Sequence, residues 1–66
     1  MARTTSTPEE VLNLAMSKER AAFRAYDRML RVANIDLIRD LLQDLKNEEY
    51  KHIQMIEARL MRIRLG

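Results

Sequence analysis

Three polar residues interrupt apolar patterns that would otherwise run along two helices. Glu19 interrupts the first pattern, and Glu49 and His52 interrupt the second. A carboxylate placed among apolar side chains costs several kcal/mol unless it is paired or bound to a metal. Carboxylate oxygens and imidazole nitrogens are common ligands of iron, manganese and zinc ions. We therefore interpret Glu19, Glu49 and His52 as a candidate metal-binding set.

The elements that must position these residues are helices. Residues 9–65 contain neither glycine nor proline and are rich in Leu, Ala, Met, Arg and Glu, a composition typical of helices. The start is marked by Thr7, which can act as N-cap, by Pro8 at the first helical position, and by Glu10, which completes a capping box. Residues 1–7 are expected to form a flexible N-terminal tail.

The apolar periodicity changes phase once, which predicts two helices and not one. The first seam comprises Leu12, Ala15, Glu19, Ala22, Tyr26, Met29 and Ala33. The second comprises Ile38, Leu42, Leu45, Glu49, His52, Ile56, Arg59 and Ile63. The phase changes at Asn34-Ile35-Asp36, where Asn34 or Asp36 can cap the next helix. We predict helices over about 8–33 and 36–64, packed antiparallel within a single domain, 8–66.

The hairpin brings the polar residues to one level. Glu19 and Glu49 each lie about 15 residues from the turn, which corresponds to roughly 22 Å along either helix. His52 follows Glu49 by three residues, on the same face and one turn further on. One hairpin is therefore expected to offer Glu, Glu and His side chains to one point.

Chain length indicates that the hairpin needs further stabilisation. A chain of 66 residues buries only about 60% of its unfolded surface, and small domains use disulfides, metals or partner chains. Cysteine is absent. Apolar residues also flank both seams: Met16, Phe23, Leu30, Leu41, Ile53, Met55 and Leu60. We expect a second copy to cover them, which gives an all-α fold in which two antiparallel hairpins form a four-helix bundle by homodimerisation.

Composition excludes several other classes of protein. The longest apolar run is three residues, so no segment is expected to span a membrane. The N-terminus lacks an apolar signal core, which predicts a cytoplasmic location. One glycine excludes a Gly-rich phosphate loop. Twelve cationic residues against ten acidic ones do not favour nucleic acid as a partner.

Two hairpins related by a two-fold axis would present four carboxylates and two imidazoles. This is the ligand set of di-iron four-helix bundles, in which two helices supply Glu and two supply Glu-x-x-His. Four carboxylates also balance the charge of two divalent cations. We therefore predict two iron ions per dimer interface, with manganese or zinc as possible substitutes.

The same residues carry a resemblance to a known family. Glu19, followed 30 positions later by Glu49 within Asn47-Glu48-Glu49-Tyr50-Lys51-His52, resembles the pattern of the encapsulated ferritin-like group, or half-ferritins, of the ferritin and rubrerythrin superfamily. The resemblance covers about residues 9–64. Tyr26, two turns after Glu19, falls where that group often has an aromatic residue beside its centre.

The resemblance implies a function. It implies a ferroxidase for iron storage or detoxification, with a di-iron centre between two chains and Glu19, Glu49 and His52 as ligands and catalytic residues. Tyr26 and Glu48 would lie just outside the ligands. It also implies a ring of dimers and a possible place inside an encapsulin shell. Members that enter such shells continue into a further helix and a targeting peptide, which the last residues, 61–66, do not resemble.

Two alternatives stay open at this point. An arginine column, Arg20, Arg24, Arg28 and Arg31, is compatible with an RNA-binding dimer of helical hairpins. A metal-free structural or interaction bundle is the other alternative. An acidic column, Asp36, Asp40, Asp44 and Glu48, runs toward the candidate site and can be a solvated face or a feed path for iron.

Overall fold

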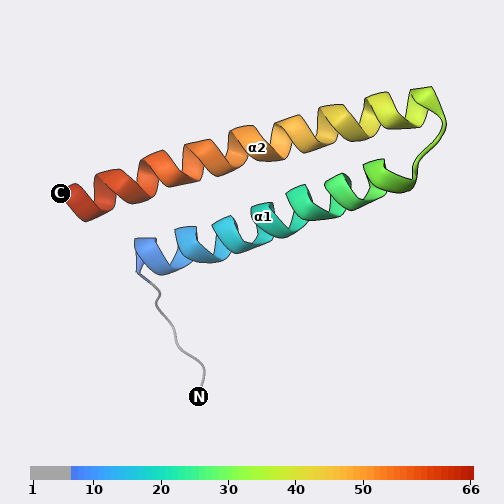
Figure 1. Ribbon diagram of the computed structural model, residues 1–66. Helices are drawn as coiled ribbons and strands as arrows, with labels where there is room; N and C mark the ends of the chain where they lie inside the picture. Colours follow the sequence, from blue (N-terminus) through green and yellow to red (C-terminus); the bar gives the residue numbers. More distant parts are fainter. Residues whose placement is uncertain (1–6) are drawn as a thin grey trace, which may run out of the picture.

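Two antiparallel helices joined by a short link make up the part of the chain that the structure describes, residues 7–66 (Figure 1). In this computed structural model, α1 spans Pro8–Val32 and α2 spans Asp36–Leu65. The predicted all-α hairpin is confirmed, and each predicted helix end lies within one residue of the observed one. Its pairing with a second copy stays a prediction. The predicted tail lies outside the described residues, except for Thr7.

The first helix begins with the predicted capping box. The Thr7 hydroxyl accepts a hydrogen bond from the Glu10 backbone N–H at 3.1 Å, and the Thr7 N–H donates to Glu10 Oε1 at 2.9 Å. Pro8 occupies the first turn, where a missing N–H costs nothing. Local sequence alone therefore fixes where α1 starts.

The link between the helices differs from the prediction. Neither Asn34 nor Asp36 caps α2; the N-cap is Ile35, which makes no side-chain capping bond. Ala33 and Ile35 are both extended, and no non-glycine residue in the described range has a positive φ. On the other side of the link, Arg39 Nη1 donates to the carbonyl oxygens of Leu30 and Ala33 and so satisfies the C-terminal end of α1.

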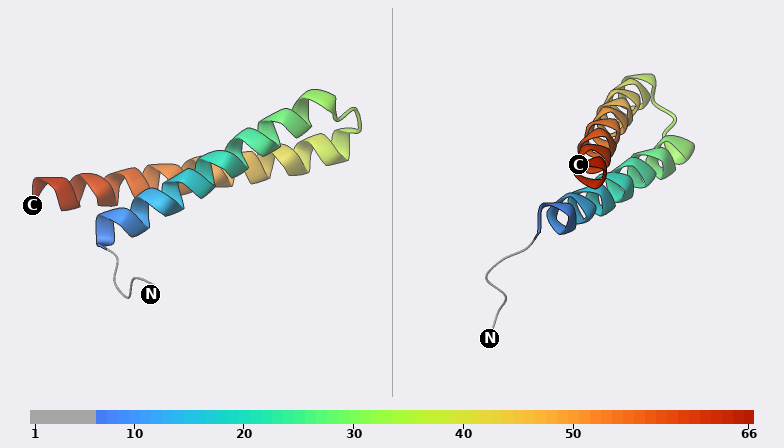
Figure 2. Two further views of the ribbon diagram at one scale, coloured as in Figure 1. Left: turned by 90° about the horizontal axis from the view of Figure 1, so that it is seen from below. Right: turned by 90° about the vertical axis from the view of Figure 1, so that its left-hand side faces the viewer.

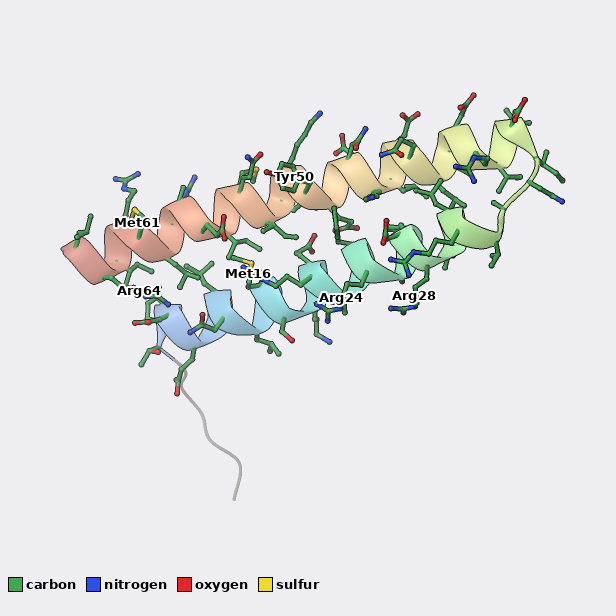
Figure 3. The ribbon with its side chains drawn as sticks, in the orientation of Figure 1. Met16, Arg24, Arg28, Tyr50, Met61 and Arg64 are labelled. Carbon is green, nitrogen blue, oxygen red and sulfur yellow. The ribbon has the colours of Figure 1, made fainter. Side chains whose placement is uncertain are left out.

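The core lies between the helices and combines residues of the predicted seams, Leu12, Leu42 and Ile56, with residues that flank them. The buried side chains are Met16, Leu30, Leu42, Ile53 and Leu60. Met16 of α1 packs with Ile53 and Leu60 of α2, and Figure 3 shows it pointing toward α2. Most of these residues are those that flank the seams. The seam residues themselves are mostly half-buried or exposed, because a single pair of helices covers only the strip along which they touch.

The hairpin therefore leaves much apolar surface uncovered. Figure 2 shows the two helices crossing as a slender pair, with no further element of the described chain packed on them. The exposed apolar side chains include Val11, Met29, Ile38, Leu41, Met55 and Ile63. Exposed apolar residues in this number are typical of a chain that packs against a partner. Within the described range, neither helix is long and apolar enough to cross a membrane.

Candidate metal centre

The structure brings Glu19 of α1 together with Glu49 and His52 of α2. One ligand atom of each residue lies within 4.8 Å of the others. Among residues 7–66, this is the one group of three or more metal-ligating side chains with such a spacing. The predicted convergence at one level is present. It follows because Glu19 and Glu49 lie the same number of residues from the ends of their helices at the link.

The His52 ring bridges the two carboxylates. Its Nδ1 lies 2.9 Å from Glu19 Oε1 and 3.5 Å from Glu49 Oε1. With Glu19 ionised, the Nδ1–H donates to it, which fixes the ring orientation. The same nitrogen faces both carboxylates, so it is the atom aimed at the point where a metal would be held.

Glu49 is the least satisfied member of the cluster. Its side chain is 18% exposed, against 28% for Glu19 and 46% for His52. Its Oε1 is buried and has no hydrogen-bond partner in the described structure, since the contact to His52 at 3.5 Å is too long to satisfy it. A buried carboxylate oxygen without a donor is unfavourable in the metal-free state. A cation at this point would remove the deficit, so the donor set fits a metal.

The charges of the cluster are strongly linked. Hydrogen bonding with Glu49 and with His52 lowers the pKa of Glu19. Hydrogen bonding with Glu19, reinforced by burial, raises the pKa of Glu49. The Glu19 carboxylate raises the pKa of His52. The cluster therefore retains protons that a metal would displace, and metal binding is expected to release them.

The two additional residues predicted around the site lie at different distances. Glu48 is exposed, and its Oε1 is 4.0 Å from His52 Nε2, on the side of the ring opposite the cluster. The Nζ of Lys51 lies 3.6 Å from Glu48 Oε2. Tyr26 is half-buried two turns along α1, and its hydroxyl makes no hydrogen bond to the cluster within the described residues. Its role beside the centre stays a prediction.

The arginine column on α1 is only partly free. Arg20 pairs with Glu57 at 3.3 Å, and Arg31 pairs with Asp27 at 2.8 Å. Asp27 also accepts from Lys46 at 2.8 Å, and this lysine lowers the pKa of Asp27. Half of the predicted RNA-binding column is thus engaged in ion pairs within the hairpin.

Comparison with known proteins relates the chain to one relative. No family model and no solved structure matches it. An uncharacterized protein of Archaeoglobus fulgidus is 37% identical over 59 residues, which cover 89% of this chain and 92% of the relative. The two proteins belong to one family. The alignment is long enough to span the greater part of both helices, so the relative is expected to share the hairpin.

Sequence reasoning found every ligand-type residue that the described structure places in this cluster. It missed how the cluster is held without metal. The direct contact between His52 Nδ1 and Glu19, and the orphaned Glu49 Oε1, depend on the rotation of the two helices about their axes. No periodic pattern in the sequence reports that rotation to the required precision.

Proposed function

We propose that the protein is a ferroxidase that oxidises ferrous iron at a two-metal centre formed between two copies of the hairpin. The observation that carries the proposal is the convergence of Glu19, Glu49 and His52 within 4.8 Å. Three ligands from one chain leave a metal ion incompletely coordinated. A second chain would supply an equal set and so complete sites for two ions.

The surroundings of the cluster support a two-fold pairing. The three side chains are partly exposed, and they lie along the helix edges that carry the uncovered seam residues. Ile38 is 43% exposed and Met29 is 47% exposed, so apolar surface continues on both helices toward the turn. A second hairpin on this face would bury apolar area and bring the two clusters together.

Ferrous iron is the substrate in this proposal, and each ion gives one electron to dioxygen or peroxide. Hard carboxylate oxygens suit ferric iron, so binding by Glu19 and Glu49 favours the oxidised product. These two residues would serve as terminal or bridging ligands, and His52 as a terminal nitrogen ligand. Four carboxylates against two divalent cations would make the centre neutral, which reduces the cost of burying it.

The residues next to the ligands have supporting roles in the proposal. Glu48 Oε1 lies 4.0 Å from His52 Nε2, beyond hydrogen-bond distance, and a change of its side-chain rotamer would let it orient the ring, as outer carboxylates commonly do at metal-bound histidines. Tyr26 would lie beside the centre in the paired state. Manganese or zinc would bind the same ligands without supporting the oxidation in the same way.

The proposal extends to assembly through the resemblance to half-ferritins. Dimers would associate into an open ring, which encloses no storage cavity. Storage of the ferric product would then require a separate container, such as an encapsulin shell. Without a shell, the same chemistry would serve iron detoxification.

The proposal is tested by iron oxidation. Anaerobic protein is given two ferrous ions per dimer and then air, and ferric absorbance is followed. Glu49→Ala and His52→Ala are expected to slow oxidation about a hundredfold or more, whereas Asp44→Ala, an exposed carboxylate change away from the cluster, leaves the rate unchanged. Wild-type rates in both ligand variants, with assembly intact, would contradict the proposal.

A further inference from the structure

The outer face of α1 carries a column of four arginines, of which Arg20 and Arg31 are paired with Glu57 and Asp27 of the same hairpin. We define the arginine face as Arg20, Arg24, Arg28 and Arg31. Arg24 and Arg28 are exposed and form no ion pair within residues 7–66, and Figure 3 shows both projecting from the side of α1 that faces away from α2. Arg24 borders a groove of about 340 Å³ whose wall includes Phe23, Tyr50 and Ile53.

The outer face of α2 carries the opposite charge. We define the acidic face as Asp36, Asp40 and Asp44, which are exposed and form no ion pair within the described range. Two leucines lie next to this column and are strongly exposed: Leu37 is 76% and Leu41 is 53% accessible. Like charges four residues apart repel, so each column on its own is mildly unfavourable.

The two columns have matched spacing. Residues four apart on a helix are separated by about 6 Å along the axis, so cations of one column meet anions of the other one for one. Two arginine faces repel each other, so no contact between copies pairs this face with itself. The exposed leucines beside the aspartates can enter the groove beside Arg24 and Tyr50.

We infer that the arginine face of one copy binds the acidic face of another copy. This contact is head-to-tail, since it joins two different surfaces, and both columns follow the four-residue ridges of their helices. Such ridges pack with a crossing angle of about 50°. Head-to-tail contacts propagate into a closed ring or an open filament.

The contact is separate from the metal-bearing face. Arg28 follows Glu19 by nine residues and Asp40 precedes Glu49 by nine residues. At about 100° per residue, nine residues make two and a half turns, so Arg28 and Asp40 each lie opposite the cluster on their own helix. A copy can therefore use the arginine face, the acidic face and the metal-bearing face at once.

The test is sedimentation velocity of the full chain with chelator present, so that metal plays no part. It compares two salt concentrations. The screening length is about 30 Å at about 0.01 M salt and about 3 Å at about 1 M salt. Wild type is expected to form large species at roughly tenfold lower protein concentration in low salt. Arg24→Glu and Asp40→Arg should each remove this salt-dependent step. A mixture of the two variants should form a one-to-one pair in low salt but no larger species, because each variant keeps only the face that the other lacks.

Matched controls separate this contact from general charge effects. Arg62→Glu changes the net charge as Arg24→Glu does but lies outside both faces, so it should keep the wild-type behaviour. Helicity by circular dichroism checks folding, and the milder Arg24→Gln and Asp40→Asn should weaken the same step. The inference is overturned if both charge reversals keep the wild-type distribution, or if large species form only with added RNA. Failure of iron oxidation would leave this result unaffected.

Discussion

His52 Nδ1 lies 2.9 Å from Glu19 Oε1, so a side chain of α2 is bonded to a side chain of α1 at the middle of the hairpin. The contact joins two residues that are 33 positions apart in the chain. It also lies beside Glu49, whose Oε1 has no partner in the described structure. The metal-free cluster is thus one favourable ion pair next to one unfavourable carboxylate.

The first prediction is a pH optimum for the stability of the metal-free protein. Folding lowers the pKa of Glu19. Its contribution to the free energy of unfolding is therefore present above a pH of about 4.5 and is lost as the pH falls through the pKa of the folded state. Folding raises the pKa of His52. Its contribution to the free energy of unfolding is therefore complete below a pH of about 6.5 and is lost as the pH rises through the pKa of the folded state. The raised pKa of Glu49 adds a loss that begins as the pH rises above about 4.5, which moves the peak toward the acid end of the window. Stability should therefore peak between these limits.

Urea unfolding followed by circular dichroism, in chelator and across this pH range, measures the effect. His52→Gln should flatten the alkaline decline while keeping helicity. An unchanged decline in that variant would show that His52 is not paired with Glu19 in solution.

The second prediction is that Glu49→Gln stabilises the metal-free protein near neutral pH. The amide removes a charge with a raised pKa and can donate to Glu19, so a gain of about 1 kcal/mol is expected. The same variant should lose metal affinity. Glu48→Gln is the matched control, since Glu48 is exposed and should change stability little. Equal unfolding midpoints for Glu49→Gln and wild type would contradict the orphaned state of Glu49.

The third prediction links metal to two-fold association. Metal ions that need ligands from both chains bind only the dimer and therefore stabilise it. When the free metal concentration is a hundredfold above the dissociation constant, the gain is about 2.7 kcal/mol, which raises the affinity of the dimer about a hundredfold. Ferrous, manganous, cobalt or zinc ions should enlarge the sedimenting species in high salt, and chelator should reverse the change. Glu19→Ala should abolish this dependence. If the protein binds metal and the mass of the sedimenting species does not change, the ligands lie within one chain and the prediction is wrong.

The fourth prediction concerns the link between the helices. Arg39 donates to the carbonyl oxygens of Leu30 and Ala33, which otherwise have no partner at the end of α1. Arg39→Ala should lower the free energy of unfolding by about 1–2 kcal/mol, and Arg39→Lys should recover part of it. Arg62→Ala, which removes an exposed arginine elsewhere on α2, should have little effect. Urea midpoints compared at one protein concentration provide the measurement.

Much of this hairpin follows from local rules in the sequence. The absence of glycine and proline, the capping box at Thr7 and Glu10, and the phase change near Asn34 determine that there are two helices and roughly where each one ends. Counting residues from the turn also places Glu19 level with Glu49 and His52. These features depend on neighbours within one or two turns, and such neighbours are visible in the chain.

Tertiary packing decided the rest. The helices turn Met16, Ile53 and Leu60, which flank the predicted seams, toward each other, and the same rotation aims His52 Nδ1 at Glu19. It also places Arg39 against the C-terminal carbonyls of α1. The rotation of each helix about its axis is set by the sum of many weak contacts along the whole interface. No short stretch of sequence contains that sum, whereas the period of 3.6 residues per turn is present in every stretch.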